Sequence, residues 1–307
     1  MNFRSVIVLC GGGSSSEREV SLASGENVYR LCMESFPTEK VILESDDLPL
    51  HVRKATDSVI FPETLGEFGE DGKLQALMEA AGLTFVGSGS ESSALCMDKT
   101  MTKRIVSEHG IRVPNGISIK KSNTPAVGEI IASLGECLFL KPNARGSSIG
   151  ARVISSKHEL EEAINAMPDD MEYVVESKIN GIDLTVAVLD GQAFEVVEIL
   201  PKRGFLDYDN KYITGMSDKI CPARIAKDVE EMVKRHGELA FKCCNCRDWA
   251  RVDFMLCDGG ELFFFEVNTI PGMTETSFFP ISVAAAGIDQ KTLVARLVNL
   301  AASRMPR

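Results

Sequence analysis

Two polar side chains interrupt an apolar run near the end of the chain. In the segment FFFEVNTIPGM, Glu266 and Asn268 stand where a buried strand would carry further apolar residues. The preceding segment WARVDFMLC is typical of a second strand, and Gly259-Gly260 between the two is typical of a two-residue hairpin turn. The two strands are therefore predicted to pair as an antiparallel hairpin.

This pairing gathers four polar side chains on one face of the hairpin. With the turn at the two glycines, Asp253 faces Glu266 across the hairpin. Arg251 then faces Asn268, and all four side chains share a face because alternate residues of a strand point the same way. The opposite face is predicted to be apolar and to consist of Phe263, Phe265 and Val267.

A divalent cation would explain why two carboxylates face each other. At a separation of about 5 Å and an effective dielectric constant of about 20, their repulsion is about 3 kcal/mol. Two carboxylates and an amide are ligands that Mg²⁺ takes when phosphate oxygens and water fill its other positions. The alternative is an ordinary solvent-facing side of a hairpin. We favour the metal site because Asn268 and Arg251 share the face with Asp253 and Glu266.

A glycine-rich turn supplies a second candidate for phosphate binding. In FLKPNARGSSIG, Lys141 ends a strand and small residues follow, which would let backbone N–H groups approach phosphate oxygens beside a lysine charge. The segment is not a GxxxxGK[ST] loop, and no GxGxxG follows the first strand of the chain. A hairpin turn without any ligand is the alternative.

Two further segments carry polar residues that could contact a substrate. Near the N-terminus, Ser16 and Glu19 match a capping box, which does not explain Glu17. Glu17 could bind a substrate amino group, or it could be an acidic residue that the helix dipole favours in the first turn. The long polar stretch 201–221 contains the pair Lys211-Tyr212, and its length is typical of a lid or of a solvated loop.

Composition limits the class of protein. The 307 residues, 44% hydrophobic and 25% charged, are typical of a globular chain of two domains or three small ones, and no apolar stretch is long enough to span a membrane. The net charge of −11 argues against nucleic acid or an anionic membrane as a partner and favours a small substrate. Nine cysteines without framework spacing and a brief N-terminal apolar run indicate the cytoplasm.

The order of predicted elements indicates an α/β unit followed by α+β units. Strands in SVIVLC, SVIF and LTFVGSG alternate with helices at 17–36 and in KLQALMEAAG, which predicts a parallel sheet with helices on its faces and a boundary near residue 89. Strands in CLFLKP, IGARVI and EYVVES with the helix SKHELEEAINAM form a second unit. The last unit holds the strands LTVAVLDG and AFEVVEIL, a helix at 225–242, the hairpin and a final helix QKTLVARLVNLAAS.

The cysteines of Cys243–Cys246 are not predicted to bind zinc, because no second Cys or His pair stands at zinc-site spacing. Their thiols are expected where the helix ends.

Taken in chain order, these segments resemble the D-alanine–D-alanine ligases of the ATP-grasp superfamily over nearly the whole chain. The resemblance is carried by GGGSSSEREVSLASG, FGEDGKLQ, VGSGSESSALCMDK, KPNARGSSIG, DYDNKY, ARVDFML and FFFEVNTIPGMTETSFFP. It implies a three-domain ATP-grasp architecture: an N-terminal Rossmann-like substrate-binding domain at 1–89, a small central domain at 90–180, and a C-terminal domain at 181–307 with the metal site and the lid. It also implies a cytoplasmic homodimer that makes a peptidoglycan precursor.

The same resemblance implies a reaction and the residues that serve it. The carboxylate of one D-alanine attacks the γ-phosphate of ATP, and the amine of a second D-alanine then displaces phosphate from the acyl phosphate. By motif, the catalytic residues are Glu17, Ser147, Tyr212, Arg251 and Gly272. ATP would be bound by Lys99, Lys141, Glu176, Ile179, Asp183 and Lys211, and the second substrate by Ser277 and Phe278. Two Mg²⁺ ions, with Mn²⁺ as a substitute, would be held by Asp253, Glu266 and Asn268.

Four positions depart from the family pattern. Leu65 takes the place of a histidine in the first-substrate region, and Phe278 takes the place of a leucine in the second-substrate pocket. Asp183 replaces a ribose-binding glutamate, and Lys178 stands at an often aromatic place in the adenine segment. Leu65 and Phe278 leave the acceptor open between D-alanine and another amino acid such as D-serine.

Overall fold

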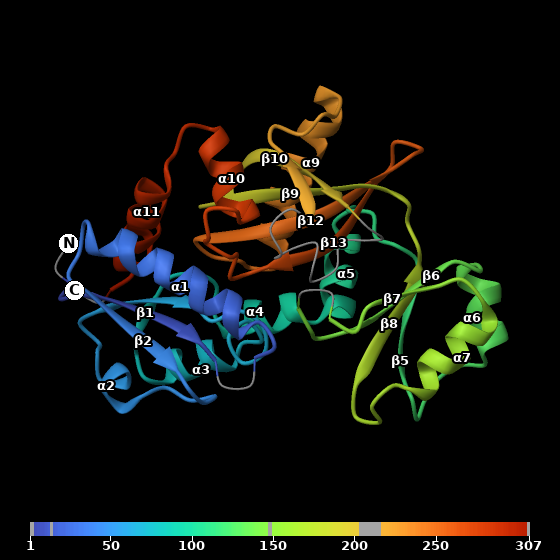
Figure 1. The fold of residues 1–307 in the computed structure, drawn as a ribbon, viewed down its shortest axis with the longest axis horizontal. Helices are drawn as coiled ribbons and strands as arrows, with labels where there is room; N and C mark the ends of the chain where they lie inside the picture. The colour runs from blue at the N-terminus through green and yellow to red at the C-terminus, as the bar shows by residue number, and fades with distance from the viewer. Residues whose placement is uncertain (1–2, 13–14, 147–148, 203–215, 306–307) are drawn as a thin grey trace.

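A computed structural model describes residues 3–12, 15–146, 149–202 and 216–305, and these build three sheets (Figure 1). The first sheet is parallel, in the order β2-β1-β3-β4. Its strands are β1 Val6–Gly11, β2 Thr38–Leu43, β3 Val59–Glu63 and β4 Thr84–Phe85. Its helices are α1 Arg18–Met33, α2 Leu50–Arg53 and α3 Lys73–Ala80. The predicted parallel sheet is confirmed, but the sequence prediction lacked β2 and α2, and α1 ends at Met33 rather than at residue 36.

Helices cover both faces of the parallel sheet. All six residues of β1 are buried, and its alternate side chains enter different cores. Val6 and Val8 pack in the core shared with α1, whereas Ile7 and Leu9 pack in the core shared with α2 and α3. Burial on both sides explains why SVIVLC is continuously apolar rather than alternating.

The second sheet is antiparallel, in the order β5-β8-β6-β7. Its strands are β5 Gly116–Lys120, β6 Leu138–Pro142, β7 Arg152–Ile154 and β8 Glu172–Ser177. The helices α6 Val127–Leu134 and α7 Lys157–Asn165 close a core of their own with this sheet, seen at the right of Figure 1.

The third sheet is also antiparallel, in the order β11-β10-β9-β12-β13. Its strands are β9 Gly181–Leu189, β10 Gln192–Pro201, β11 Ser217–Ile220, β12 Trp249–Cys257 and β13 Leu262–Asn268. The helices around it are α4 Ser90–Met97, α5 Lys99–Glu108, α9 Lys227–Cys243 and α10 Phe278–Ala285. Strand β11 lies within 201–221, so the end of that predicted loop is instead a strand paired with β10.

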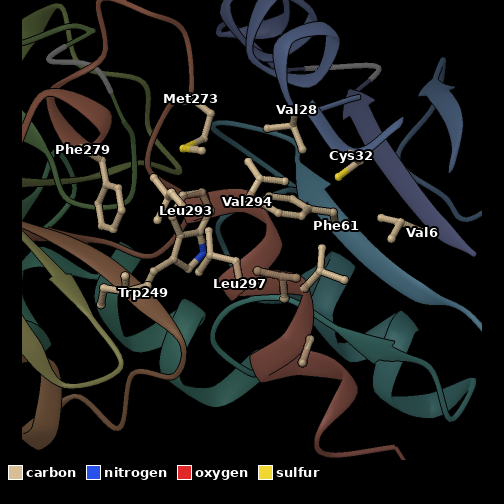
Figure 2. Close-up of a cluster of buried hydrophobic side chains, with 14 of the residues drawn as sticks. Val6, Val28, Cys32, Phe61, Trp249, Met273, Phe279, Leu293, Val294 and Leu297 are labelled. Carbon is tan, nitrogen blue, oxygen red and sulfur yellow. The ribbon is translucent and has the colours of Figure 1, made fainter. Parts of the chain in front are cut away.

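The last helix, α11 Gln290–Ala302, leaves the third sheet and packs against the first. Its residues Leu293 and Leu297 share one core with Val6 of β1 (Figure 2). Trp249 of β12 lies in the same core, with its ring edge-on to Phe61 at 5.8 Å between centroids. The first and third sheets are therefore joined by one apolar core, and the division of the chain at residues 89 and 180 stays a prediction.

The hairpin turn differs from its prediction by one residue. The amide of Gly260 donates to the carbonyl of Cys257, Cys257 pairs with Glu261, and Gly260 has a φ of 82°. The turn therefore spans three residues, 258–260, and a left-handed glycine closes it. Farther along, the register shifts between Asp253 and Phe254, which restores the predicted pairs nearer the site.

This register shift also changes which side chains form the apolar face. Phe264 and Val267 are buried in the core beside α9, whereas Phe265 lines a cavity on the other face. The predicted apolar set containing Phe263 and Phe265 is therefore wrong, because the extra residue of the bulge reverses the alternation before Glu266.

The predicted capping box is also absent. The helix N-cap of α1 is Glu17, without a side-chain capping bond within the described part of the chain, and the Ser16 hydroxyl donates to Glu67 instead. The helix therefore begins one residue later than the S-x-x-E spacing requires. In the ranges described, no helix is both long and apolar enough to cross a membrane.

Removal of the Trp249 side chain should destabilise the shared core. Trp249 is 1% exposed, so we expect Trp249→Ala to lower the free energy of unfolding by about 3–5 kcal/mol, measured by urea unfolding followed by circular dichroism. Leu50→Ala is the control, because Leu50 is 67% exposed and its truncation should cost under about 0.5 kcal/mol. Equal midpoints for the two variants would contradict the account of this core.

Candidate active site

The polar face of the β12–β13 hairpin is arranged as the sequence predicted. Arg251 pairs with Asn268 and Asp253 with Glu266 across the two strands. The Arg251 guanidinium donates two hydrogen bonds of 2.9 Å to the two oxygens of Asp253. Thr185 of the neighbouring strand β9 donates to Asp253 at 2.6 Å, so this carboxylate is held in one orientation.

The hairpin face opens into a large cavity, of about 930 Å³, between the second and third sheets. Seven of the predicted site residues line it: Lys99, Lys141, Glu176, Ile179, Asp183, Asp253 and Glu266. A smaller cavity of about 300 Å³ adjoins it and shares Lys99 and Glu266, and Asn268 lies in its wall. The two cavities place the described residues among those predicted to bind nucleotide and metal around one space.

A buried carboxylate lies between two lysines at one wall of the large cavity. Glu176 of β8 contacts Lys103 of α5 and accepts from Lys141 of β6 at 2.7 Å. Burial alone would raise the pKa of Glu176, but the two lysine charges lower it to about 2. Burial also lowers the pKa of Lys103 to about 7. The ion triad therefore joins α5 to the second sheet.

Lys99 connects the glycine-rich turn with the polar face of the hairpin. Its ammonium donates to the backbone carbonyl of Arg145 at 2.6 Å and lies 3.6 Å from Glu266. Lys141 lies 5.2 Å from the centre of the Phe265 ring, which faces the same cavity. Two lysine charges thus stand on the cavity side of the carboxylates, where phosphate groups would enter.

Glu17 reaches the glycine-rich turn from the first sheet. Its side chain is buried, and a Cβ added at Gly146 would lie 2.4 Å from its Oε2. A Cβ at Gly66 would lie 3.0 Å from the same atom. Only glycines permit this approach, so the carboxyl group is enclosed by two segments far apart in the sequence.

A second carboxyl group, Glu70, lies beside Glu17. It accepts from the amide of Gly66 at 2.7 Å and lines the smaller cavity. Burial, and then the charge of Glu17, raise the pKa of Glu70 to about 8, although Gly66 and Arg251 oppose this. An amino group in the smaller cavity would relieve the repulsion between the two carboxyl groups.

The segment after β13 brings Gly272 and Ser277 together. A Cβ at Gly272 would lie 3.1 Å from the Ser277 hydroxyl, which accepts from the amide of Thr274 at 3.0 Å. Phe278 begins α10, and its ring lies 5.5 Å from the Arg251 guanidinium carbon. Of these three residues, Phe278 lies beside Arg251, and none of the three is among the residues that line the two cavities.

Sequence reasoning missed Glu70 and Lys103 as site residues. Lys103 follows Lys99 by four residues, which places both lysines on one face of α5. Glu70 lies in the quoted segment FGEDGKLQ, but its burial was not visible in the sequence. Ser147, Lys211 and Tyr212 lie outside the described residues, so their predicted positions stay predictions.

The donor set fits a divalent cation that takes further ligands from a substrate. In the described ranges, no group of three His, Cys, Asp or Glu side chains could hold a metal ion by itself. Asp253, Glu266 and the amide of Asn268 offer oxygen ligands on one hairpin face, as the register shows. Mg²⁺ is commonly bound by one or two carboxylates together with phosphate oxygens and water.

The two antiparallel sheets, with a cavity between them lined by lysines and carboxylates, define the ATP-grasp class of fold. Residues 105–299 match the family model described as D-ala D-ala ligase C-terminus. The chain belongs to the D-alanine–D-alanine ligase family.

Relatives match along nearly the whole chain. The D-alanine–D-alanine ligase of Desulforudis audaxviator is 37% identical over 302 residues, covering 95% of this chain and 97% of the relative. That of Aquifex aeolicus is 36% identical, covering 95% and 99%.

Solved structures agree with the same fold. The VanG D-Ala:D-Ser ligase of Enterococcus faecalis is 31% identical, with a TM-score of 0.85 and coverage of 97% and 99%. The D-alanine–D-alanine ligase of Bacillus anthracis complexed with ATP is 28% identical, with a TM-score of 0.84 and coverage of 97% and 98%.

The Glu176 triad should make stability depend on acid pH. The folded carboxyl stays charged down to about pH 2, whereas its ordinary pKa is 4.5, so its stabilisation is present above pH 4.5 and is lost as the pH falls toward 2. We expect Glu176→Gln to cost about 3–5 kcal/mol at pH 7, because it leaves two lysines without their partner, and to flatten the loss below pH 4.5.

Thermal unfolding at several pH values measures both effects. Glu161→Gln is the matched control, because its carboxylate pairs with Lys157 on the exposed side of α7 and should contribute less than about 1 kcal/mol. An unchanged acid profile in Glu176→Gln would show that the triad does not carry this dependence.

Proposed function

We propose that the chain joins two D-alanine molecules to D-alanyl-D-alanine, consuming ATP and releasing ADP and phosphate for peptidoglycan precursor synthesis. The observation that carries this proposal is the hairpin face of Arg251, Asp253, Glu266 and Asn268 beside a cavity lined by Lys99 and Lys141. Phosphoryl transfer to a carboxylate needs cations at the phosphates, and the following acyl transfer needs donors at a developing oxyanion.

Charge in the large cavity supports a nucleotide accompanied by metal ions. Among the described residues, four cationic and four acidic side chains line it: Lys99, Lys141, Arg145 and Lys178, and Glu176, Asp183, Asp253 and Glu266. The charges of these lining side chains therefore cancel, so they would leave the negative charge of a bound triphosphate uncompensated. Mg²⁺ held by Asp253, Glu266 and Asn268 would supply that compensation and stabilise charge on the transferred phosphate.

Protein groups account for each step of the reaction. Glu176, Ile179 and Asp183 bind adenine and ribose, while Lys99, Lys141 and Lys211 neutralise the phosphates. Lysine charges at the γ-phosphate permit attack by the carboxylate of the first D-alanine, which is otherwise repelled. The acyl phosphate that results is then attacked by the amine of the second D-alanine.

The amino-acid sites lie toward the first sheet. Glu17 binds the first amino group, and a network through Ser147 to Tyr212 closes over it. Arg251 and the amide of Gly272 stabilise the oxyanion of the tetrahedral intermediate. Ser277 and Phe278 contact the carboxylate side of the second substrate. The closeness of Ser277 to Gly272 and of Phe278 to Arg251 supports this assignment. A cytoplasmic homodimer completes the proposal.

A second candidate function differs from the first in the amino acid that accepts the acyl group. The solved VanG relative is titled a D-Ala:D-Ser ligase, and Leu65 and Phe278 depart from the pattern of D-alanine ligases near the two amino-acid sites. An enzyme that joins D-alanine to D-serine would use the same residues for ATP and for the acyl phosphate.

The amino acids that turn over separate the two candidates. Purified protein with Mg·ATP and D-alanine should release phosphate and give D-alanyl-D-alanine, identified by mass spectrometry. D-Alanine with D-serine is the paired reaction. A mixed dipeptide without any D-alanyl-D-alanine would replace the first candidate by the second, and no phosphate release with any pair would refute both.

Glu266→Gln tests the metal site. The amide keeps the size of the side chain but removes the charge that binds a cation, so we expect ADP production to fall at least about a hundredfold. The melting temperature and circular dichroism should match the wild type. Glu261→Gln on the same hairpin is the control, because Glu261 pairs with Arg112 at the surface and should leave turnover unchanged. Near-normal turnover by Glu266→Gln would remove Glu266 from the metal site.

A further inference from the structure

Two thiols from distant parts of the chain meet where α9 ends. Cys96 lies in the last turn of α4, and Cys246 lies just after α9. Their sulfur atoms are 3.8 Å apart. Ser92, one turn before Cys96 on the same face of α4, donates its hydroxyl hydrogen to the Cys246 sulfur at 3.6 Å. The Cys246 sulfur therefore contacts α4 at two points.

The turn that carries Cys246 has a defined backbone geometry. Asn245, the residue before it, has a φ of 54°, in the left-handed region. The amide of Cys246 donates to the carbonyl of Phe241 at 2.9 Å, and the amide of Asn245 donates to the carbonyl of Lys242 at 3.0 Å. These two bonds and the left-handed residue form a Schellman motif, a common end of an α-helix. The sequence CCNC therefore ends α9 and turns Cys246 back beside it.

The segment before α4 is bound to the same turn. The amide of Arg247 donates to the Ser88 hydroxyl at 3.1 Å, and the Arg247 side chain donates to the carbonyl of Gly87 at 2.7 Å. Arg247 directly follows Cys246, and Ser88 lies just before α4. Backbone contacts on both sides therefore keep the Cys96 and Cys246 sulfurs together.

The two thiols differ in their exposure to solvent. Cys96 is 4% exposed, whereas Cys246 is half-buried and lines a cavity beside α9 together with Arg235 and Lys242. A small oxidant from solvent therefore reaches the Cys246 sulfur first. In the part of the chain that the structure describes, no three His, Cys, Asp or Glu side chains are placed to hold a metal ion, so a metal centre does not explain the thiols.

Cys96 also lies at the wall of the candidate active site. It lines the smaller cavity together with Glu266. Lys99, which begins α5 three residues after Cys96, has its ammonium 3.6 Å from Glu266. Between them, Asp98 accepts from the side chain of Asn143 in the glycine-rich turn at 2.9 Å. A displacement of Cys96 would therefore act on groups that surround this cavity.

We propose that Cys96 and Cys246 form an oxidation site, at which hydrogen peroxide links the two sulfurs in a disulfide that lowers the activity of the adjacent site. The effect on activity rests on the proposed function. Disulfide sulfurs lie about 2.0 Å apart, so the two sulfurs must approach each other by about 1.8 Å. A shift of this size beside a catalytic cavity lowers the rate, because the reacting groups must stay aligned.

The oxidation takes two steps. The Cys246 sulfur attacks one oxygen of hydrogen peroxide, so that an S–O bond forms, the O–O bond breaks, and a sulfenic acid and one water result. The Cys96 sulfur then attacks the sulfenic sulfur: the S–S bond forms, the S–O bond breaks, and the Cys96 thiol proton leaves with the hydroxide as a second water. The two thiols are oxidised and the peroxide is reduced. Dithiothreitol reverses the link by thiol–disulfide exchange.

Peptide mapping tests the link itself, whatever reaction the protein catalyses. After treatment with hydrogen peroxide, alkylation of the remaining thiols and digestion with trypsin, mass spectrometry should find the peptides of Cys96 and Cys246 joined. Cys246 shares its tryptic peptide with Cys243 and Cys244, so the mapping is repeated in the Cys243→Ala/Cys244→Ala double variant, where the link should persist. It should be absent from Cys246→Ser. No link in the wild type, or a link from Cys96 to Cys244, would refute the proposal.

The D-alanine ligation assay tests the effect of the link on activity. Peroxide should lower the activity of the wild type at least about tenfold, and dithiothreitol should restore it. Cys246→Ser should match the wild type before oxidation and keep its activity afterwards. Cys96→Ala should also be insensitive to peroxide, judged against its own reduced activity. Cys137→Ser is the matched control, because it removes an exposed thiol outside the pair and should respond to peroxide as the wild type does.

Failure of this inference differs from failure of the proposed function. A reduced wild type without ligase activity would refute the function, while the peptide map would still decide whether the link forms. An active wild type that forms the link and keeps full activity would refute the effect on the site. Equal losses in the wild type and in Cys246→Ser would also refute it, because the sensitivity to peroxide would then arise elsewhere in the chain.

Discussion

The pairing of Asp253 with Glu266 across β12 and β13 is the constraint on which the site depends. Two acidic side chains on adjacent strands repel each other unless cations compensate. Arg251 forms two hydrogen bonds to Asp253, and Lys99 lies 3.6 Å from Glu266. The compensation thus comes from the same hairpin on one side and from α5 on the other, which fixes the helix beside the sheet.

The Glu176 triad extends this principle to the second sheet. Its carboxylate is buried, and burial is tolerated because Lys103 and Lys141 contact it from two different elements. The Glu176 carboxylate on β8 therefore also holds α5 against the second sheet, through Lys103. The large cavity is lined by ion pairs of this kind, whereas an apolar cavity would exclude phosphate groups.

Local patterns in the sequence predicted the elements but not their exact register. The apolar run of β1 and the alternation around Glu266 indicated a parallel sheet and a polar hairpin face, and both are present. The predicted two-residue turn was wrong, yet the bulge near Phe265 cancels the error, so the Asp253–Glu266 pair was predicted correctly for an incomplete reason. A bulge depends on packing against both faces of a sheet, which no short segment reveals.

Local sequence patterns could not predict contacts between segments that lie far apart in the chain. Strand β2 alternates weakly, and β11 lies in a polar stretch, so only pairing with their neighbours defines them as strands. Likewise, Lys103 and Glu70 became site residues because folding buries them beside other charged groups. Residue type alone could not distinguish them from the many exposed lysines and glutamates of the chain.

The distribution of apolar and polar contacts explains where the site is rigid. One core contains β1, α1, α11, Trp249 and Met273, so Glu17 and Gly272 are held in a fixed relation although they come from the first and last parts of the chain. The second sheet has its own core, and it meets the rest of the molecule through the Lys103–Glu176 ion pair and through glycine-rich backbone. Polar interfaces separate at less cost than apolar cores. The residues proposed to bind the amino acids therefore lie on the part that shares one core, and the cavity proposed for the nucleotide lies where two separately folded sheets meet.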